Sequence, residues 1–138
     1  QLKADVAITN RWSMRQLLPA GAIKLQHVYD ILPFNNHVVR VKIKGSDLIE
    51  SATCCHGAIE GMKQAGSQWV LSTGRPVQPN QTYNVVTSDY TYMGGSGFKF
   101  RKYDPNGQLL MDFREPVIAW TRAHRSSKAK PLETILNR

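Results

Sequence analysis

Residues 37–44, HVVRVKIK, alternate apolar and basic side chains. Val39, Val41 and Ile43 occupy every second position, and basic residues lie between them. A period of two is typical of a β-strand that buries one face and exposes the other. Such a strand needs neighbouring strands and a second layer of structure over its apolar face. The chain must therefore build a sheet with other elements packed against it.

A helix is predicted directly after this strand. Gly45 interrupts the alternation, and Ser46 is a favourable N-cap residue. The apolar positions that follow have helical spacing: Leu48, Ala52, Cys55 and Ile59. This pattern places Cys55 in the core, where a free cysteine behaves as a small hydrophobic residue.

The two cysteines of the chain, Cys54 and Cys55, are adjacent. Adjacent cysteines rarely bridge each other, so we expect no disulfide framework and draw no redox compartment from them. A metal site formed by these residues and His56 is disfavoured, because adjacent helical side chains point in different directions.

The other predicted elements are a strand at 5–9, a short helix within 23–34 that ends at Pro33, two strands within 68–88, a hairpin within 98–113 around the DPNG turn, and a helix at 115–124. Strands and helices are mixed without a strict βαβ repetition. We therefore expect an α+β fold with a mixed sheet and packed helices, in one compact domain of residues 1–138.

The net charge is +8, which favours anionic partners. Residues 99–138 hold nine Lys or Arg against four Asp or Glu, and the basic stretch 122–131 (RAHRSSKAKP) is expected to be a solvated end. Neither an RNA-binding aromatic signature nor an apolar run of the roughly 20 residues that a membrane span requires is present. A nucleic-acid partner is therefore disfavoured.

No sequence motif predicts catalysis within this chain. The four histidines are spread out and outside metal-binding motifs: His27, His37, His56 and His124. The glycine cluster lacks the spacing of a nucleophile elbow and the Lys of a Walker loop. We therefore expect neither a catalytic residue nor a metal ligand in this chain, which is expected to bind rather than cleave.

Residues 90–98, YTYMGGSGF, place three aromatic residues around three glycines. Glycine permits a positive φ and close approach of a neighbour. The aromatic residues could belong to the core or form a surface on which a flat ligand stacks. The residues alone leave both interpretations open.

Three stretches, ADVAITNRWSMR (4–15), ILPFNNHVVRVKIKGSDL (31–48) and YNVVTSDYTYMGGSGFKF (83–100), occur in an order that carries a family resemblance. Together they resemble the C-terminal, substrate-binding domain of the 5′-nucleotidase family, which includes UDP-sugar hydrolases and 2′,3′-cyclic-nucleotide phosphodiesterases. The similarity covers most of residues 4–100 and, more loosely, the last helix and residues 130–138.

The resemblance implies a substrate site. Phe34 and Tyr90 match the two aromatic residues that hold the nucleobase between their rings, and stacking of this kind tolerates any base. Arg15 matches an arginine that contacts phosphate, and Asn36 matches an asparagine at the base edge. The remaining matched positions are Asn10, Gly94, Gly95 and Ser96.

The chain departs from the family pattern at two places. Arg11, Trp12 and Ser13 stand where the family has glycines, and Ser96 stands where it has an aspartate. We expect the first change either to narrow the phosphate side of the predicted site or to change its ligand, and the second removes a negative charge. We expect a domain that is divergent or truncated at its N-terminal side.

In the family, hydrolysis takes place at a divalent metal pair in a separate N-terminal domain. The resemblance therefore implies a nucleotide- or nucleoside-binding domain that positions substrate and does not hydrolyse it alone, in a periplasmic or extracellular setting. The alternative is a free-standing, catalytically inactive binding or interaction module with the same fold. A nucleic-acid binder that uses the basic tail is a third hypothesis.

Overall fold

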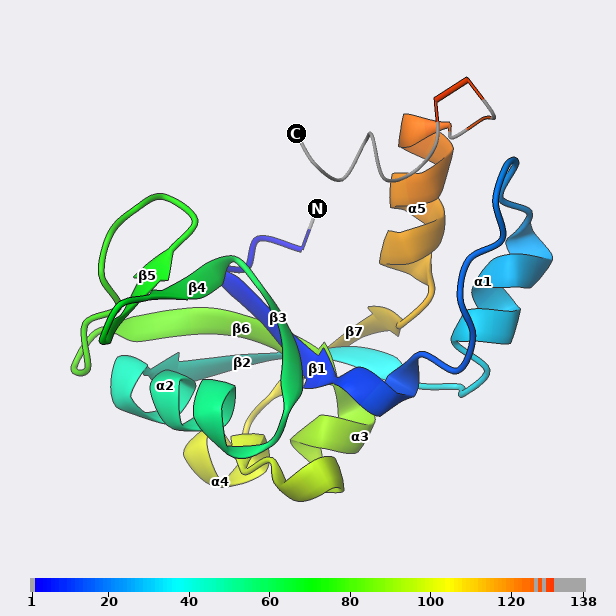
Figure 1. Ribbon diagram of the computed structural model, residues 1–138. Helices are drawn as coiled ribbons and strands as arrows, with labels where there is room; N and C mark the ends of the chain where they lie inside the picture. The colour runs from blue at the N-terminus through cyan, green and yellow to red at the C-terminus, as the bar shows by residue number, and fades with distance from the viewer. Residues whose placement is uncertain (1, 126, 128, 131–138) are drawn as a thin grey trace. The chain divides into compact units, whose positions relative to one another are not determined.

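The computed structural model describes residues 2–125, 127, 129 and 130 (Figure 1). Its elements are, in order, β1 (Val6–Asn10), the 3-10 helix η1 (Arg11–Ser13), α1 (Leu25–Ile31), β2 (His37–Lys44), α2 (Gly45–Cys54), β3 (Gly57–Glu60), β4 (Met62–Ala65), β5 (Gln68–Leu71), β6 (Thr82–Ser88), α3 (Asp89–Tyr92), the 3-10 helix η2 (Gly95–Gly97), α4 (Phe100–Tyr103), β7 (Gln108–Asp112) and α5 (Glu115–His124). The chain divides into two compact units, which are interleaved along the sequence. Unit 1 is residues 1–11 and 36–111, and unit 2 is residues 12–35 and 112–138.

A five-stranded sheet with the order β3-β1-β6-β2-β7 is the main feature of unit 1. β1 pairs in parallel with β6 and antiparallel with β3, and β2 pairs antiparallel with β6. The predicted mixed sheet and α+β class are therefore confirmed. The strand predicted from the alternation at 37–44 is β2, where Val39, Val41 and Ile43 are buried.

The core of unit 1 lies between this sheet and the helices α2, α3 and α4, which gather on one face of it (Figure 1). Leu48 of α2 and Phe100 of α4 are fully buried against strand residues such as Val41 and Val85. The rings of Phe98 and Phe100 stack, with centroids 5.4 Å apart. The second sheet, the antiparallel pair β4-β5, contributes buried Met62 and Leu71 to the same core.

Three local predictions are wrong. The predicted N-cap Ser46 lies inside the helix, which begins at Gly45 after the N-cap residue Lys44. The predicted helix ends at Cys54, and Ile59 lies in β3. The C-cap residue Cys55 has a non-helical φ of −128° and His56 a φ of 49°, and residues from Gly57 onward pair with β1. The first arm of the hairpin predicted within 98–113 is also wrong, because α4 (Phe100–Tyr103) stands where its first strand was expected.

Unit 2 contains α1 and α5, which contact each other. The helix predicted to end before Pro33 is α1, and the helix predicted from Pro116 is α5. Among the described residues of this unit, the buried apolar side chains are Val28 and Leu32. Within the part of the chain that the structure describes, there is no helix with the length and hydropathy of a membrane span.

Candidate functional site

Tyr90 lies at the junction between β6 and α3. Ser88 caps α3, because its Oγ accepts a hydrogen bond from the backbone N–H of Thr91 at 3.2 Å. The hydroxyls of Thr87 and Thr91 bond to each other in the buried interior below the turn. This buried network fixes the turn, while the Tyr90 side chain is 51% exposed. Tyr90 is thus an exposed ring on a well-supported backbone.

The glycine loop that follows lies against this ring. A Cβ at Gly95 would be 2.4 Å from Cε1 of Tyr90, so the ring needs the absence of a side chain there. Gly94, Ser96 and Gly97 have φ values of 103°, 58° and 85°, the left-handed region that favours glycine. The loop therefore has a role that the sequence did not indicate: it makes room for the ring of Tyr90.

Tyr92 behaves differently from its neighbour. Its ring packs against Gly107, and its hydroxyl bonds to the turn formed by residues 104–107. Of the two tyrosines in this stretch, Tyr92 supports the fold and Tyr90 faces solvent. The core interpretation fits Tyr92, and a stacking role for Tyr90 stays a prediction.

Asn36 lies beside Tyr90 in unit 1, and its side chain is held by Asp89. Asn36 Nδ2 donates to Asp89 Oδ1 at 2.5 Å, and Oδ1 also accepts from the backbone N–H of Tyr90 at 2.8 Å. His37 Nδ1 is 3.5 Å from the other oxygen, Asp89 Oδ2. Sequence analysis missed Asp89 and His37, although both lie within the quoted stretches next to predicted residues.

The end of β1 is the third part of unit 1 that carries predicted residues. Asn10 is buried and lies opposite Gly57 of β3 in the sheet register. Arg11 Nε donates to the carbonyl of Gly57 at 3.3 Å. Arg11, one of the departures from the family pattern, thus contacts the neighbouring strand, whereas Trp12 of unit 2 is 74% exposed.

The other two predicted residues lie together in unit 2. The guanidinium of Arg15 lies over the ring of Phe34, 5.0 Å from its centroid, a cation–π contact. The backbone N–H of Arg15 donates to the carbonyl of Ile31 at 2.9 Å. Phe34 remains 44% exposed, so one of its faces contacts a cation while much of the ring is open to solvent.

Arg114 is a buried charged residue of unit 2, and no sequence pattern predicted its role. It donates to both carboxylate oxygens of Asp112 at 3.0 Å and to Asn35 Oδ1 at 2.8 Å, and it lies 4.5 Å from the ring centroid of Tyr29. The hydrogen bonds that Arg114 donates to the Asp112 carboxylate raise the pKa of this guanidinium. Arg114 joins the start of α5 to the segment after α1, next to Phe34 in the sequence.

The predicted site residues thus fall into two groups. Unit 1 carries Asn10, Asn36, Tyr90, Gly94, Gly95 and Ser96, and unit 2 carries Arg15 and Phe34. The structure brings Asn36 and Tyr90 together through Asp89, and it brings Arg15 and Phe34 together directly. The clamp of Phe34 and Tyr90 combines residues of both units and stays a prediction.

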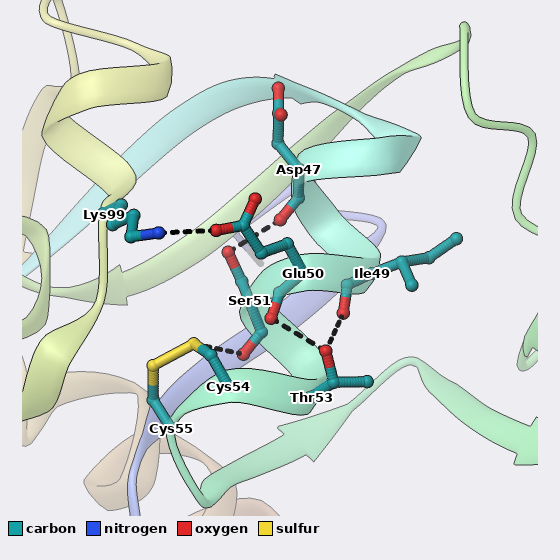
Figure 2. Close-up of a disulfide and its surroundings, with 8 residues drawn as sticks. All are labelled: Asp47, Ile49, Glu50, Ser51, Thr53, Cys54, Cys55 and Lys99. Atoms are coloured by element: carbon teal, nitrogen blue, oxygen red, sulfur yellow. Dashed lines mark hydrogen bonds and ion pairs between the residues drawn. A yellow bond between two sulfur atoms is a disulfide. The ribbon is translucent and has the colours of Figure 1, made fainter.

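Cys54 and Cys55 form a disulfide at the end of α2 (Figure 2). The expectation that these adjacent cysteines do not bridge is therefore wrong, and so is the assignment of Cys55 as a free core cysteine. Helical geometry separates adjacent side chains, but α2 ends at Cys54, and the turn after it brings the two sulfurs together. A Cβ at Gly97 would be 3.8 Å from Cys55 Sγ, so the disulfide borders the glycine loop.

The described residues contain no cluster of three or more His, Cys, Asp or Glu side chains able to hold a metal ion. Part of the basic tail is described: Arg122 and Arg125 line a pocket of unit 2 together with Ala22, Ile23 and Thr121. Residues 126, 128 and 131 of that tail, and the loosely matched stretch after it, lie outside the described residues.

Comparison with known proteins agrees with this architecture. Residues 1–52 match the family model described as "5′-nucleotidase, C-terminal domain". Protein UshA of Yersinia enterocolitica is 27% identical over 108 residues, which are 69% of this chain and 20% of that protein. Endonuclease YhcR of Bacillus subtilis is 28% identical over 122 residues, which are 78% of this chain and 10% of that protein. The chain thus spans a fifth or less of these curated relatives.

Solved structures share the fold. The Haemophilus influenzae NAD nucleotidase has a TM-score of 0.71 at 20% identity, with 90% of this chain and 28% of that chain covered. The 5′-nucleotidase precursor of Thermus thermophilus has a TM-score of 0.65 at 23% identity, with 80% and 26% covered. This chain is thus similar to 5′-nucleotidase C-terminal domains over residues 1–52, and it shares the fold of the two solved nucleotidase structures.

Proposed function

We propose that this chain is the nucleotide- or nucleoside-binding domain of a 5′-nucleotidase-like metallophosphohydrolase. Its role is to hold the base between Phe34 and Tyr90 while a separate domain with a divalent metal pair hydrolyses the phosphate ester. Tyr90 carries the proposal: it is a half-exposed ring that the Ser88 cap, the Asp89 carboxylate and the space at Gly95 hold in place.

Phosphate recognition is assigned to Arg15. Its guanidinium lies on the ring of Phe34, so a base stacked on the open part of that ring would place a phosphate near a cation. Asn10 and Ser96 are assigned to the same ligand, at the end of β1 and in the glycine loop. Gly94 and Gly95 belong to the same loop and are assigned to close approach of the ribose.

Export is part of the proposal. The disulfide supports a periplasmic or extracellular setting, because disulfides persist in oxidising compartments and are rare in reducing ones.

The test is titration of the 138-residue chain with adenosine and AMP. A stacked base contributes about 1–3 kcal/mol per ring, so Phe34→Ala and Tyr90→Ala should each weaken binding roughly 5- to 150-fold. Leu109→Ala is the matched control, because it removes an equally exposed apolar side chain from unit 1. Equal affinity in the wild type and in both aromatic variants would contradict the proposal that Phe34 and Tyr90 hold the base.

The alternative is a free-standing, inactive binding or interaction module. The exposed Trp12 favours it, because a bulky ring in place of the family's glycines is a feature of protein contact surfaces. Metal-ligand motifs in the coding sequence upstream of Gln1 would favour the hydrolase, and an open reading frame without them would favour the module. Binding of RNA or DNA that weakens steeply with added salt would instead support a nucleic-acid role.

A further inference from the structure

The side-chain amide of Asn36 has a defined orientation. Its Nδ2 donates to Asp89 Oδ1 at 2.5 Å. A carboxylate accepts hydrogen bonds and donates none, so the nitrogen of the amide, not its oxygen, must face Asp89. No described residue donates to Asn36 Oδ1, and the side chain is half-buried. Asn36 therefore offers a hydrogen-bond acceptor to whatever lies beside Tyr90.

Asp89 is itself fixed, which makes this orientation a property of the fold. Its Oδ1 also accepts from the backbone N–H of Tyr90 at 2.8 Å, and His37 lies 3.5 Å from its Oδ2. A backbone donor cannot rotate away, so the carboxylate stays beside Asn36. Asp89, the residue before Tyr90, thus determines the orientation of the Asn36 side-chain amide.

We propose that Asp89 is a positioning residue that makes this site prefer bases with an exocyclic amino group. The inference rests on the proposed function. The carbonyl of Asn36 can accept a hydrogen bond from the amino group of adenine or cytosine. Hypoxanthine and uracil carry an oxo group at the corresponding position. That group is also an acceptor, so it cannot form a hydrogen bond with the Asn36 carbonyl. Stacking on Tyr90 does not discriminate between bases, so the choice falls to Asn36.

The test compares two pairs of ligands that differ in this group, adenosine with inosine and cytidine with uridine. The wild-type 138-residue chain should bind the amino member of each pair roughly three- to tenfold more tightly, the range of one net hydrogen bond. Asp89→Ala removes the carboxylate that accepts from Asn36 Nδ2. The Asn36 amide can then turn either its oxygen or its N–H groups toward the ligand, and the preference for amino bases should be lost.

Asp47→Ala is the matched control, because it makes the same change in the first turn of another helix of unit 1 and should keep the wild-type preference. Asn36→Ala gives a second reading that does not depend on Asp89: amino and oxo bases should bind with equal affinity. An Asn36→Ala chain that keeps the amino preference would overturn the proposal, as would an Asp89→Ala chain that keeps it.

These failures differ from failure of the proposed function. If no nucleoside binds to the wild type, the substrate assignment itself is wrong. If all four nucleosides bind with equal affinity and Tyr90→Ala abolishes binding, the clamp stands and the role of Asp89 falls.

Discussion

The two units of this chain are held together in different ways. Unit 1 has a continuous apolar core between its sheet and α2, α3 and α4. Unit 2 has a buried arginine at its centre, and most of the exposed large apolar side chains belong to it: Trp12, Met14, Leu17, Leu18, Leu25, Tyr29, Phe34 and Val117. Burial of apolar area drives folding of the first, whereas hydrogen bonds to a charge organise the second.

This difference bears on function. In unit 1, Asn36 directly precedes β2, and Tyr90 lies in α3, which directly follows β6, so both residues adjoin strands of the core sheet. In unit 2, Arg15 and Phe34 stand on segments outside helices and strands. We therefore expect unit 1 to provide the geometry of recognition and unit 2 to be the more adaptable part. The predictions below test this contrast.

The largest effect is expected from Phe100→Ala. Phe100 is fully buried and stacks on Phe98, so its removal leaves a cavity in the core of unit 1. The free energy of unfolding should fall by about 3–5 kcal/mol in chemical denaturation. Val117→Ala in α5 of unit 2 is the control and should change it by less than about 0.5 kcal/mol, because that side chain is exposed. An equal loss of unfolding free energy in both variants would contradict the proposed difference between the two units.

Arg114→Met should act on unit 2 alone. It deletes charge-assisted hydrogen bonds to Asp112 and Asn35, with an expected cost of about 2–3 kcal/mol. Hydrogen exchange should accelerate at amides of α1 and α5 and stay unchanged in β2 and β6. Acceleration throughout the sheet would show that the two units unfold as one.

Gly95→Ala tests the support of the Tyr90 ring. Its Cβ would overlap the ring, so the ring must move, at an expected cost of about 1–2 kcal/mol. Nucleoside affinity should fall about as far as in Tyr90→Ala. Gly66→Ala is the control for a glycine without a close neighbour, although its φ of 61° carries its own strain. If Gly95→Ala binds nucleosides with wild-type affinity, the position of the Tyr90 ring at the glycine loop does not matter for binding.

The smallest effect concerns the disulfide. A bridge between adjacent residues closes a very short loop, so loop closure predicts a stabilisation of only about 1 kcal/mol. Thermal unfolding with and without a dithiol reductant measures this difference. Alkylation of the denatured chain should add no mass before reduction and two alkyl groups after it, because both cysteines are bonded. Alkylation without reduction would contradict the bridge.

Local patterns were sufficient for several elements. The alternation at 37–44 predicted β2, and prolines marked the end of α1 and the start of α5, because proline restricts the backbone wherever it occurs. The same reasoning failed for α4. Phe98 and Phe100 are both buried and alternate with an exposed lysine, yet the backbone turns into a helix at Phe100, so the apolar pattern was right and its period misleading.

The sequence by itself determined the family resemblance, the α+β class and the strands and helices whose signals are local. Only the tertiary structure decided which residues meet. Asn36 and Asp89 are 53 residues apart, and strand pairing of β2 with β6 brings them into contact. The end of α2 and the disulfide beyond it depend likewise on the pairing of β3 with β1. Contacts of this kind follow from sheet register and core packing, which no short stretch of sequence encodes.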